Sequence, residues 1–229
     1  MLFILFNLFY FLNNSAEEKI IEKALNYSPP ELKIIINDNL EEFKNGIKEG
    51  RKEILNLNEI EKKIKELSKH FYEKKQVHNF IYELGKISVQ TIRSTYTFKV
   101  SEKKLYTHIK NDFPLYLEKK LKKFPIVFYG FDKNFFKGDI KNFLELEKKE
   151  KDDYLILLEK GYIKGDILLN RFSFDDRSNS FGVAQIYTNK TFSLILNVWY
   201  YIWIKNGGRW EPLKPHQLNN KLWVLAYGY

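Results

Sequence analysis

The chain contains no cysteine among its 229 residues, and this absence excludes several kinds of site. Without thiols it can form no disulfide, no thiolate zinc site and no cysteine nucleophile. It also lacks a glycine-rich phosphate loop, a nucleophile elbow and a dinucleotide fingerprint. No internal repeat, low-complexity tract or linker divides it. The sequence therefore offers no intact catalytic motif and favours one domain, which we expect to span 17–229.

Histidine is scarce as well. The four histidines, His70, His78, His108 and His216, include no pair at the three- or four-residue spacing that places two metal ligands on one helix face. A zinc site built from them would need residues that are distant in sequence to converge. Asp175 and Asp176 lie at the start of a predicted helix. Their carboxylates could hold a cation, but such a pair more often caps the helix.

What is abundant is apolar and basic. Hydrophobic residues make up 44% of the chain and aromatic residues 17%, which is enough to fill a core. The formal net charge of +9 favours acidic partners such as nucleic acid or anionic lipid. A simpler interpretation is that lysines interspersed with glutamates solvate the helix faces.

The first sixteen residues predict an export signal. Met1–Leu12 is apolar except for Asn7, and this length suits a signal peptide rather than a membrane span. We prefer cleavage after Ala16 over an uncleaved anchor or a misassigned start, although no basic residue precedes the apolar run. Ser15-Ala16-Glu17-Glu18 is also a capping box that would begin a helix at Ala16, and the two interpretations compete.

Apolar residues recur at helical spacing along the rest of the chain. Pro30 follows a helix-start motif, and Asn58 with Glu61 repeats the capping pattern. Pro114 should kink or split its helix because proline lacks a backbone donor. Gly85 could let a neighbouring helix approach closely. The predicted helices lie near 30–48, 58–71, 77–91, 101–124, 139–149, 152–160 and 180–205, with a short strand or buried turn at 126–129.

The segment Phe192–Ile204 is apolar almost all round, which indicates the central helix of a bundle. Its thirteen residues are too few to cross a bilayer. Asn206-Gly207-Gly208 should end this helix, and the aromatic tail 210–229 should lie across the bundle. The expected fold is all-α: a multi-helix bundle around a central apolar helix, with an irregular aromatic C-terminal tail.

Several stretches resemble a known family. Ala24–Leu32 reads ALNYSPPEL and leads into a helix ending near Gly46, and Phe80–Lys86 reads FIYELGK. Both are similar to the zinc-dependent phospholipase C and single-strand nuclease superfamily, as are FDDRS at 174–178 and FGVAQ at 181–185. The resemblance implies a helical bundle of the phospholipase C/nuclease kind, in which a cluster of zinc ions activates water against a phosphodiester.

The metal ligands of that superfamily are missing at the matching positions. Its central-helix His falls on Val89 and the following Asp on Arg93, while its early His falls near Glu17 and its Pro-Asp near Gly50-Arg51. Valine has no donor atom, and the permanent charge of arginine opposes a cation. We therefore expect no catalytic residue, no metal and no cofactor. The two arginines could bind a phosphate or carboxylate directly, or Arg93 could pair with a glutamate in a decayed pocket.

Our first functional hypothesis is an exported, non-catalytic homologue that binds an anionic ligand, such as a phosphate-containing lipid or nucleotide, or has an envelope role. It would be a monomer of the periplasm, cell envelope or extracellular space and could contact a membrane peripherally. Its degenerate cleft would draw on Arg51, Arg93, His70, His78, Asp175 and Asp176.

Two other hypotheses stay open. One is a metal-dependent phosphodiesterase, a phospholipase or nuclease, that holds zinc at a rearranged site built from Glu17, His70, His78, Asp175 and Asp176. The other is a basic module for nucleic acid or membrane surfaces, whose affinity would fall steeply with salt. Aromatics interleaved with basic residues could stack nucleotides in such a module, although core packing explains most of them.

Overall fold

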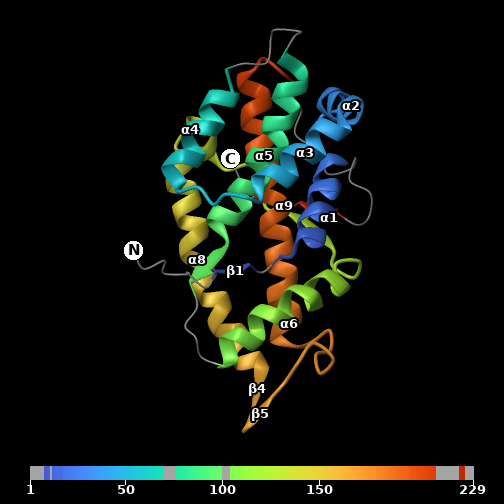
Figure 1. The fold of residues 1–229 in the computed structure, drawn as a ribbon, viewed down its shortest axis with the longest axis vertical. Helices are drawn as coiled ribbons and strands as arrows, with labels where there is room; N and C mark the ends of the chain where they lie inside the picture. Colours follow the sequence, from blue (N-terminus) through green and yellow to red (C-terminus); the bar gives the residue numbers. More distant parts are fainter. Residues whose placement is uncertain (1–7, 11, 70–75, 100–103, 210–221, 225–229) are drawn as a thin grey trace.

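The computed structural model describes residues 8–10, 12–69, 76–99, 104–209 and 222–224, and most of these are helical, which confirms the all-α class (Figure 1). The helices are α1 (Asn14–Leu25), α2 (Pro30–Asp38), α3 (Leu40–Gly50), α4 (Leu57–Leu67), α5 (Val77–Thr95), α6 (Lys104–Lys120), α7 (Lys133–Lys137), α8 (Ile140–Tyr162) and α9 (Asn179–Lys205). The strands are β1 (Leu8–Tyr10), β2 (Thr97–Lys99), β3 (Ile126–Phe128), β4 (Ile163–Lys164), β5 (Ile167–Leu168) and β6 (Leu222–Val224).

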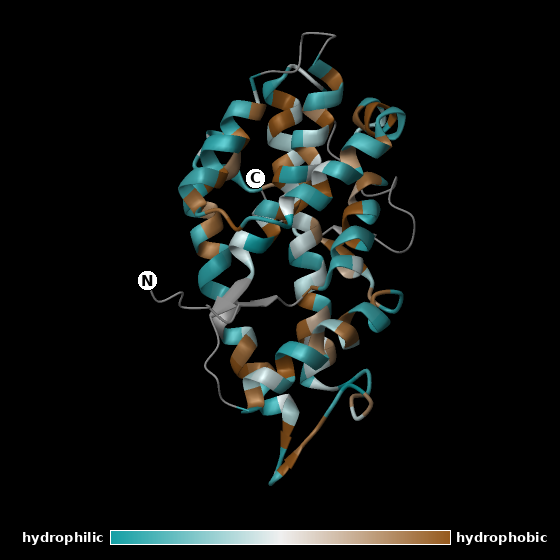
Figure 2. Ribbon diagram, in the orientation of Figure 1, coloured by the Kyte–Doolittle hydropathy of each residue, from teal (hydrophilic) through white to brown (hydrophobic). Residues whose placement is uncertain are grey.

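Helix α9 lies at the centre of the bundle, as the sequence predicts. Most of its side chains are buried, and it packs against α1, α4, α5, α6, α7, α8 and β3. Trp199 is fully buried and donates its indole N–H to the Ser88 hydroxyl of α5 at 2.8 Å. Hydrophilic and hydrophobic residues alternate along the surrounding helices (Figure 2). No helix in the described part of the chain is both long and apolar enough to cross a membrane.

Helices α3 and α5 approach closely because both carry glycine at the contact. A methyl group on Gly85 would overlap the carbonyl oxygen of Phe43, and one on Gly46 would overlap the carbonyl oxygen of Tyr82. The close approach predicted at Gly85 is thus confirmed, with a matching glycine on the partner helix. This packing fixes the end of α3, and with it Arg51, against α5.

The single helix predicted over 30–48 is wrong at Asn39, where the backbone leaves the helical region (φ −127°, ψ 39°) and separates α2 from α3. The Asn39 amide donates to the carbonyl of Ile35 at 2.8 Å, so the side chain competes with the main chain for helix hydrogen bonds. Leu40, the first residue of α3, is 40% exposed.

Two other predictions about helices are wrong in detail, and the one for Pro114 is decided only for the split. Helix α4 is capped by Asn56 with Glu59 in a capping box, two residues before the predicted Asn58. Pro114 lies inside α6 without splitting it. Residues 139–160 form one helix rather than two, because the charged stretch between the predicted halves contains no helix breaker.

Both ends of the chain contribute strands that the sequence did not predict. Strand β1 pairs antiparallel with β2, and β6, the described part of the tail, pairs parallel with β3. The rest of 210–229 lies outside the described residues, as does Phe71. Helix α1 begins at Asn14 with Asn13 as its N-cap, earlier than the predicted start at Ala16. Ala16 is fully buried inside this helix, and cleavage after it stays a prediction.

Candidate functional site

The candidate site forms around Glu17, in the first turn of α1. The Asn13 side chain accepts the backbone N–H of Ala16 at 2.8 Å and fixes where the helix begins. Ala16, Ile20 and Ile21 face the core, and Glu17 lies on the same side, with only 1% of its surface exposed. A carboxylate in the first turn is favoured by the helix dipole, but its burial requires charged partners.

Two arginines supply those partners. Arg93 donates from Nε to Glu17 Oε1 at 2.9 Å and from an Nη atom to Oε2 at 3.1 Å, a two-pronged contact. Arg51 donates from Nε to Glu17 Oε2 at 3.2 Å. Arg93 belongs to the last turn of α5 and Arg51 is the C-cap of α3, and a helix C-terminus favours a cation. We call Glu17, Arg51 and Arg93 the Glu17 cluster.

Other donors of the two arginines are also occupied by the protein. Arg93 donates to Asn14 Oδ1 at 2.8 Å and to the carbonyl oxygen of Arg51 at 3.1 Å. Arg51 donates to the carbonyl oxygen of Asn14 at 2.9 Å and pairs with Glu18 Oε1 at 2.9 Å. Two guanidinium groups thus face two carboxylates, and the cluster ties α1, α3 and α5 together.

This arrangement does not resemble a metal site. A cation at Glu17 would lie beside two permanent positive charges and would have to displace their hydrogen bonds. One turn before Arg93, Val89 is buried and offers no donor atom. Within the described ranges, no group of three or more His, Asp and Glu side chains could hold a metal ion. Of the two interpretations of Arg93, the structure contains the pairing with a glutamate.

The remaining predicted site residues lie elsewhere. His78 is at the opposite end of α5 from Arg93, about 22 Å away along the helix axis. Its imidazole is 72% exposed, with Nδ1 3.2 Å from Glu42 Oε1. His70 lies outside the described residues. The structure therefore unites Arg51 and Arg93 but does not bring His78 to them.

Asp175 and Asp176 belong to the loop before α9. Asp176 accepts hydrogen bonds from Lys120 at 2.7 Å and Lys123 at 2.8 Å, and these bonds hold the pKa of its carboxyl below the ordinary value. Asp175 accepts the backbone N–H of Arg177 at 2.9 Å. The expectation that the two aspartates cap α9 is wrong, because its N-cap is Ser178, whose hydroxyl accepts the N–H of Phe181.

A second polar group, formed by Asp112, Tyr162 and Arg171 and here called the Asp112 group, was not predicted from the sequence. Asp112 Oδ2 accepts the Tyr162 hydroxyl at 3.0 Å and the Arg171 backbone N–H at 2.7 Å, while Oδ1 accepts the Arg171 guanidinium at 3.2 Å. Burial, followed by the charge of Asp112, raises the pKa of the Tyr162 hydroxyl. Three residues so far apart in sequence carry no spacing that could have revealed the group.

Asp112 and Arg171 form one wall of a cavity of about 450 Å³. Lys104, Thr107 and His108 line it from α6, and Leu168 lines it from β5. His108 Nε2 lies 2.8 Å from the carbonyl oxygen of Leu169. Since a carbonyl oxygen only accepts, Nε2 carries the hydrogen. The cavity thus presents several hydrogen-bond donors beside one neutralised carboxylate.

A third polar group joins α5, α8 and α9. Lys190 contacts both oxygens of Glu147 at 3.1 Å and Glu150 Oε2 at 2.8 Å. Although burial lowers the pKa of Lys190, the two carboxylates raise it above its ordinary value. The Tyr96 hydroxyl donates to Glu147 at 2.8 Å, and burial followed by the Glu147 charge raises its pKa well above the ordinary value.

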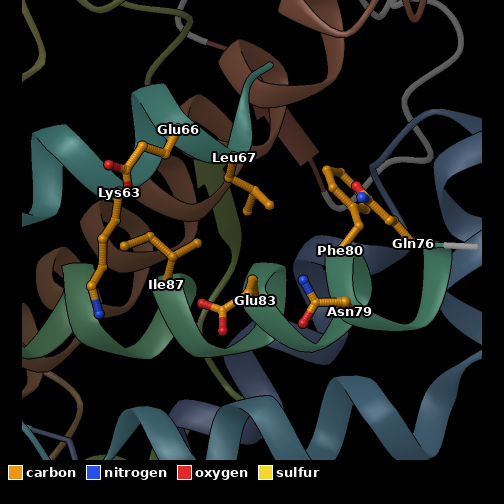
Figure 3. A pocket seen from close by; sticks show the side chains of 8 residues that line it. All are labelled: Lys63, Glu66, Leu67, Gln76, Asn79, Phe80, Glu83 and Ile87. Carbon is orange, nitrogen blue, oxygen red and sulfur yellow. The ribbon is translucent and has the colours of Figure 1, made fainter. Parts of the chain in front are cut away.

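Another cavity, of about 510 Å³, lies between α4 and α5 (Figure 3). Lys63 crosses from α4 toward α5, with Nζ 3.5 Å from Gln90 Oε1. The carboxylates of Glu66 and Glu83 and several apolar side chains lie in the same walls as Lys63, so the lining mixes both signs of charge. Its lining residues are Lys63, Glu66, Leu67, Gln76, Asn79, Phe80, Glu83 and Ile87.

Comparison of the chain with protein-family models, with curated proteins and with solved structures found no match. The resemblance to the zinc-dependent phospholipase C and single-strand nuclease superfamily therefore stays a prediction from the sequence.

Proposed function

We propose that this chain is an exported, non-catalytic helical protein that binds an anionic partner, and that the Glu17 cluster replaces the zinc centre of the superfamily it resembles. The proposal depends mainly on one observation: the Glu17 carboxylate is held by the guanidinium groups of Arg51 and Arg93. The alternative hypothesis, a metal-dependent phosphodiesterase with a rearranged site, would need this carboxylate as a metal ligand.

The positions of the cluster support the proposal. The resemblance places Arg93 at the position of a zinc ligand of the superfamily, and Glu17 and Arg51 near two others, and these three residues meet in one place. The charges at these positions then argue for a protein that keeps the bundle and has lost the metal chemistry.

The anion site itself lies away from the Glu17 cluster in our proposal. Arg51 and Arg93 use their donors largely on Glu17, Glu18, Asn14 and a backbone carbonyl, so little remains for an external ligand. The surplus of 38 basic over 29 acidic residues supplies the attraction for an anionic partner. That attraction should weaken as salt rises, because binding releases counterions.

Hydrolysis of a chromogenic phosphodiester, with zinc added and with a chelator added, tests the non-catalytic part. We expect the purified full chain to show the same background rate under both conditions. A zinc-dependent rate that the chelator abolishes would instead support the rearranged metallo-phosphodiesterase. In parallel, binding to a fluorescent single-stranded oligonucleotide and to anionic vesicles at 50 and 200 mM salt tests the anionic partner. If the chain binds neither the oligonucleotide nor the vesicles at low salt, the proposal is contradicted.

A further inference from the structure

The end of the molecule formed by α6, the β4–β5 hairpin and the loop after it has an unusual surface. Helix α8 ends at Tyr162 and leads directly into the hairpin, in which Ile163 pairs with Leu168 and Lys164 with Ile167. Gly165, with φ of 59°, makes the turn. The hairpin projects at one extremity of the long axis of the molecule (Figure 1). It is also strongly hydrophobic in colour (Figure 2).

Large apolar side chains are exposed on this projection. Ile167 is 65% exposed and Phe172, in the following loop, is 74% exposed. Of the eleven large hydrophobic residues exposed in the described part of the chain, six fall within 156–172. They are Ile156, Leu157, Ile163, Ile167, Leu168 and Phe172. Four of the six belong to the hairpin or to the loop after it, and exposed apolar groups gathered on a projection indicate a contact with another apolar phase.

Basic side chains surround the exposed apolar residues. The guanidinium of Arg171 lies 4.9 Å from the centre of the Phe172 ring, and the ammonium of Lys119 lies 5.6 Å from it. The sequence 104–123, which contains α6, has six lysines and only two acidic residues. One of these two, Asp112, is buried against Arg171 and Tyr162. Lys120 and Lys123 pair with Asp176 of the following loop, so the positive charge of this surface comes from the other four lysines and Arg171.

The cavity of about 450 Å³ opens beside the hairpin, since Leu168 belongs to both. Lys104, Thr107, Asn111 and Arg171 give it side-chain donors. Arg171 neutralises the single carboxylate in its wall. Its size and its donors suit a phosphate group presented next to an apolar chain.

We propose that this end of the molecule docks on a bilayer that contains anionic phospholipid, with one lipid headgroup phosphate in the cavity. Ile163, Ile167 and Phe172 enter the interface between headgroups and acyl chains, and Lys104, Lys119 and Arg171 contact phosphates. This inference rests on the proposed function and names its anionic partner. Nucleic acid is the less suitable occupant, because exposed isoleucines cannot stack on bases as aromatic side chains do.

Co-sedimentation of the full chain with vesicles tests the docking. We use phosphatidylcholine vesicles with and without one quarter phosphatidylglycerol, and the variants Ile167→Asp, Lys104→Glu and Ile34→Asp. Ile34 is 59% exposed on α2 and serves as the matched control. We expect binding only to the anionic vesicles, weakened about tenfold by Ile167→Asp and by Lys104→Glu and unchanged by Ile34→Asp. Circular dichroism shows whether each variant folds.

Two results would overturn the docking. One is equal binding of the wild type to both vesicle types, or to neither. The other is an equal effect of Ile167→Asp and Ile34→Asp. If the chain does not bind vesicles but binds the single-stranded oligonucleotide in a salt-dependent way, the bilayer inference is wrong, while the proposed binding of an anionic partner stands. If neither probe binds, both fall.

Discussion

Arg93 and Glu17 lie 76 residues apart in sequence and form two hydrogen bonds, 2.9 and 3.1 Å long, in an interior site where Glu17 is almost completely buried. One residue belongs to the last turn of α5 and the other to the first turn of α1. Their pairing joins the start of α1 to the end of α5.

Glu17→Gln should destabilise the protein by about 3–5 kcal/mol, because it leaves the Arg93 guanidinium without a countercharge and leaves Arg51 only the exposed Glu18. Urea denaturation gives the free energy of unfolding. Glu18→Gln is the matched control, because the Glu18 side chain is 51% exposed and pairs with Arg51. It should change the free energy of unfolding by less than about 1 kcal/mol. Equal effects of the two variants would show that the cluster is not structurally important.

Lys190→Met should destabilise the protein by about 3 kcal/mol, since Glu147 would keep its charge in a half-buried site without its cation. The double variant Lys190→Met with Glu147→Met should recover part of the loss, because it removes both charges. Lys62→Met, which breaks an exposed pair with Glu66 at 3.8 Å, is the control and should have little effect. Thermal denaturation of the four proteins provides the comparison. A double variant less stable than Lys190→Met would contradict this account.

Gly85→Ala should cost more than about 2 kcal/mol, because the new methyl group would meet the backbone of α3. Gly182→Ala offers a control on α9, where a Cβ atom would have no neighbour within 4 Å. That substitution should stabilise the protein by up to about 1 kcal/mol, since alanine favours the helix. The urea midpoints of unfolding of both variants test this prediction. If Gly85→Ala leaves the midpoint unchanged, α3 and α5 are not tightly packed.

Glu118 should make the free energy of unfolding depend on pH in the acidic range. Hydrogen bonds, first from Lys19 and then from Ser15 and Asn13, lower the pKa of its carboxyl to about 2. A group whose folded-state pKa is depressed stabilises the protein above its unfolded-state pKa, and this contribution is lost as the pH falls from about 4.5 toward 2. Because the pair is partly exposed, the contribution should be under about 1 kcal/mol. The free energy of unfolding should therefore fall less between pH 5 and pH 3 in Glu118→Gln than in the wild type.

The helices were largely predictable because burial imposes a period on the sequence. Leu84, Ile81 and Ile87 mark one face of α5, and the apolar run of α9 marks the centre of the bundle. The interruption at Asn39 was not predictable, since it depends on a side-chain hydrogen bond that competes with the helix. The β4–β5 hairpin carries its apolar residues toward the outside, so a pattern that assumes burial gives no indication of it.

The site was predictable only in part. Aligning positions with a known family singled out Glu17, Arg51 and Arg93, and periodicity alone would not have done so. The Asp112 group depends on contacts between α6 and a loop about sixty residues later, and no local pattern connects them. Charged side chains are mostly solvated, and the structure places His78 on α5 and Asp176 in the loop before α9 at the surface, 72% and 48% exposed.

The zinc content of the purified full chain, measured by elemental analysis after dialysis against zinc-containing buffer and then against metal-free buffer, tests the central claim most directly. Because guanidinium groups occupy the Glu17 carboxylate, we predict far less than one zinc ion per chain. A content near one or more ions per chain, lost on Glu17→Gln, would show that the carboxylate binds metal and would contradict the account.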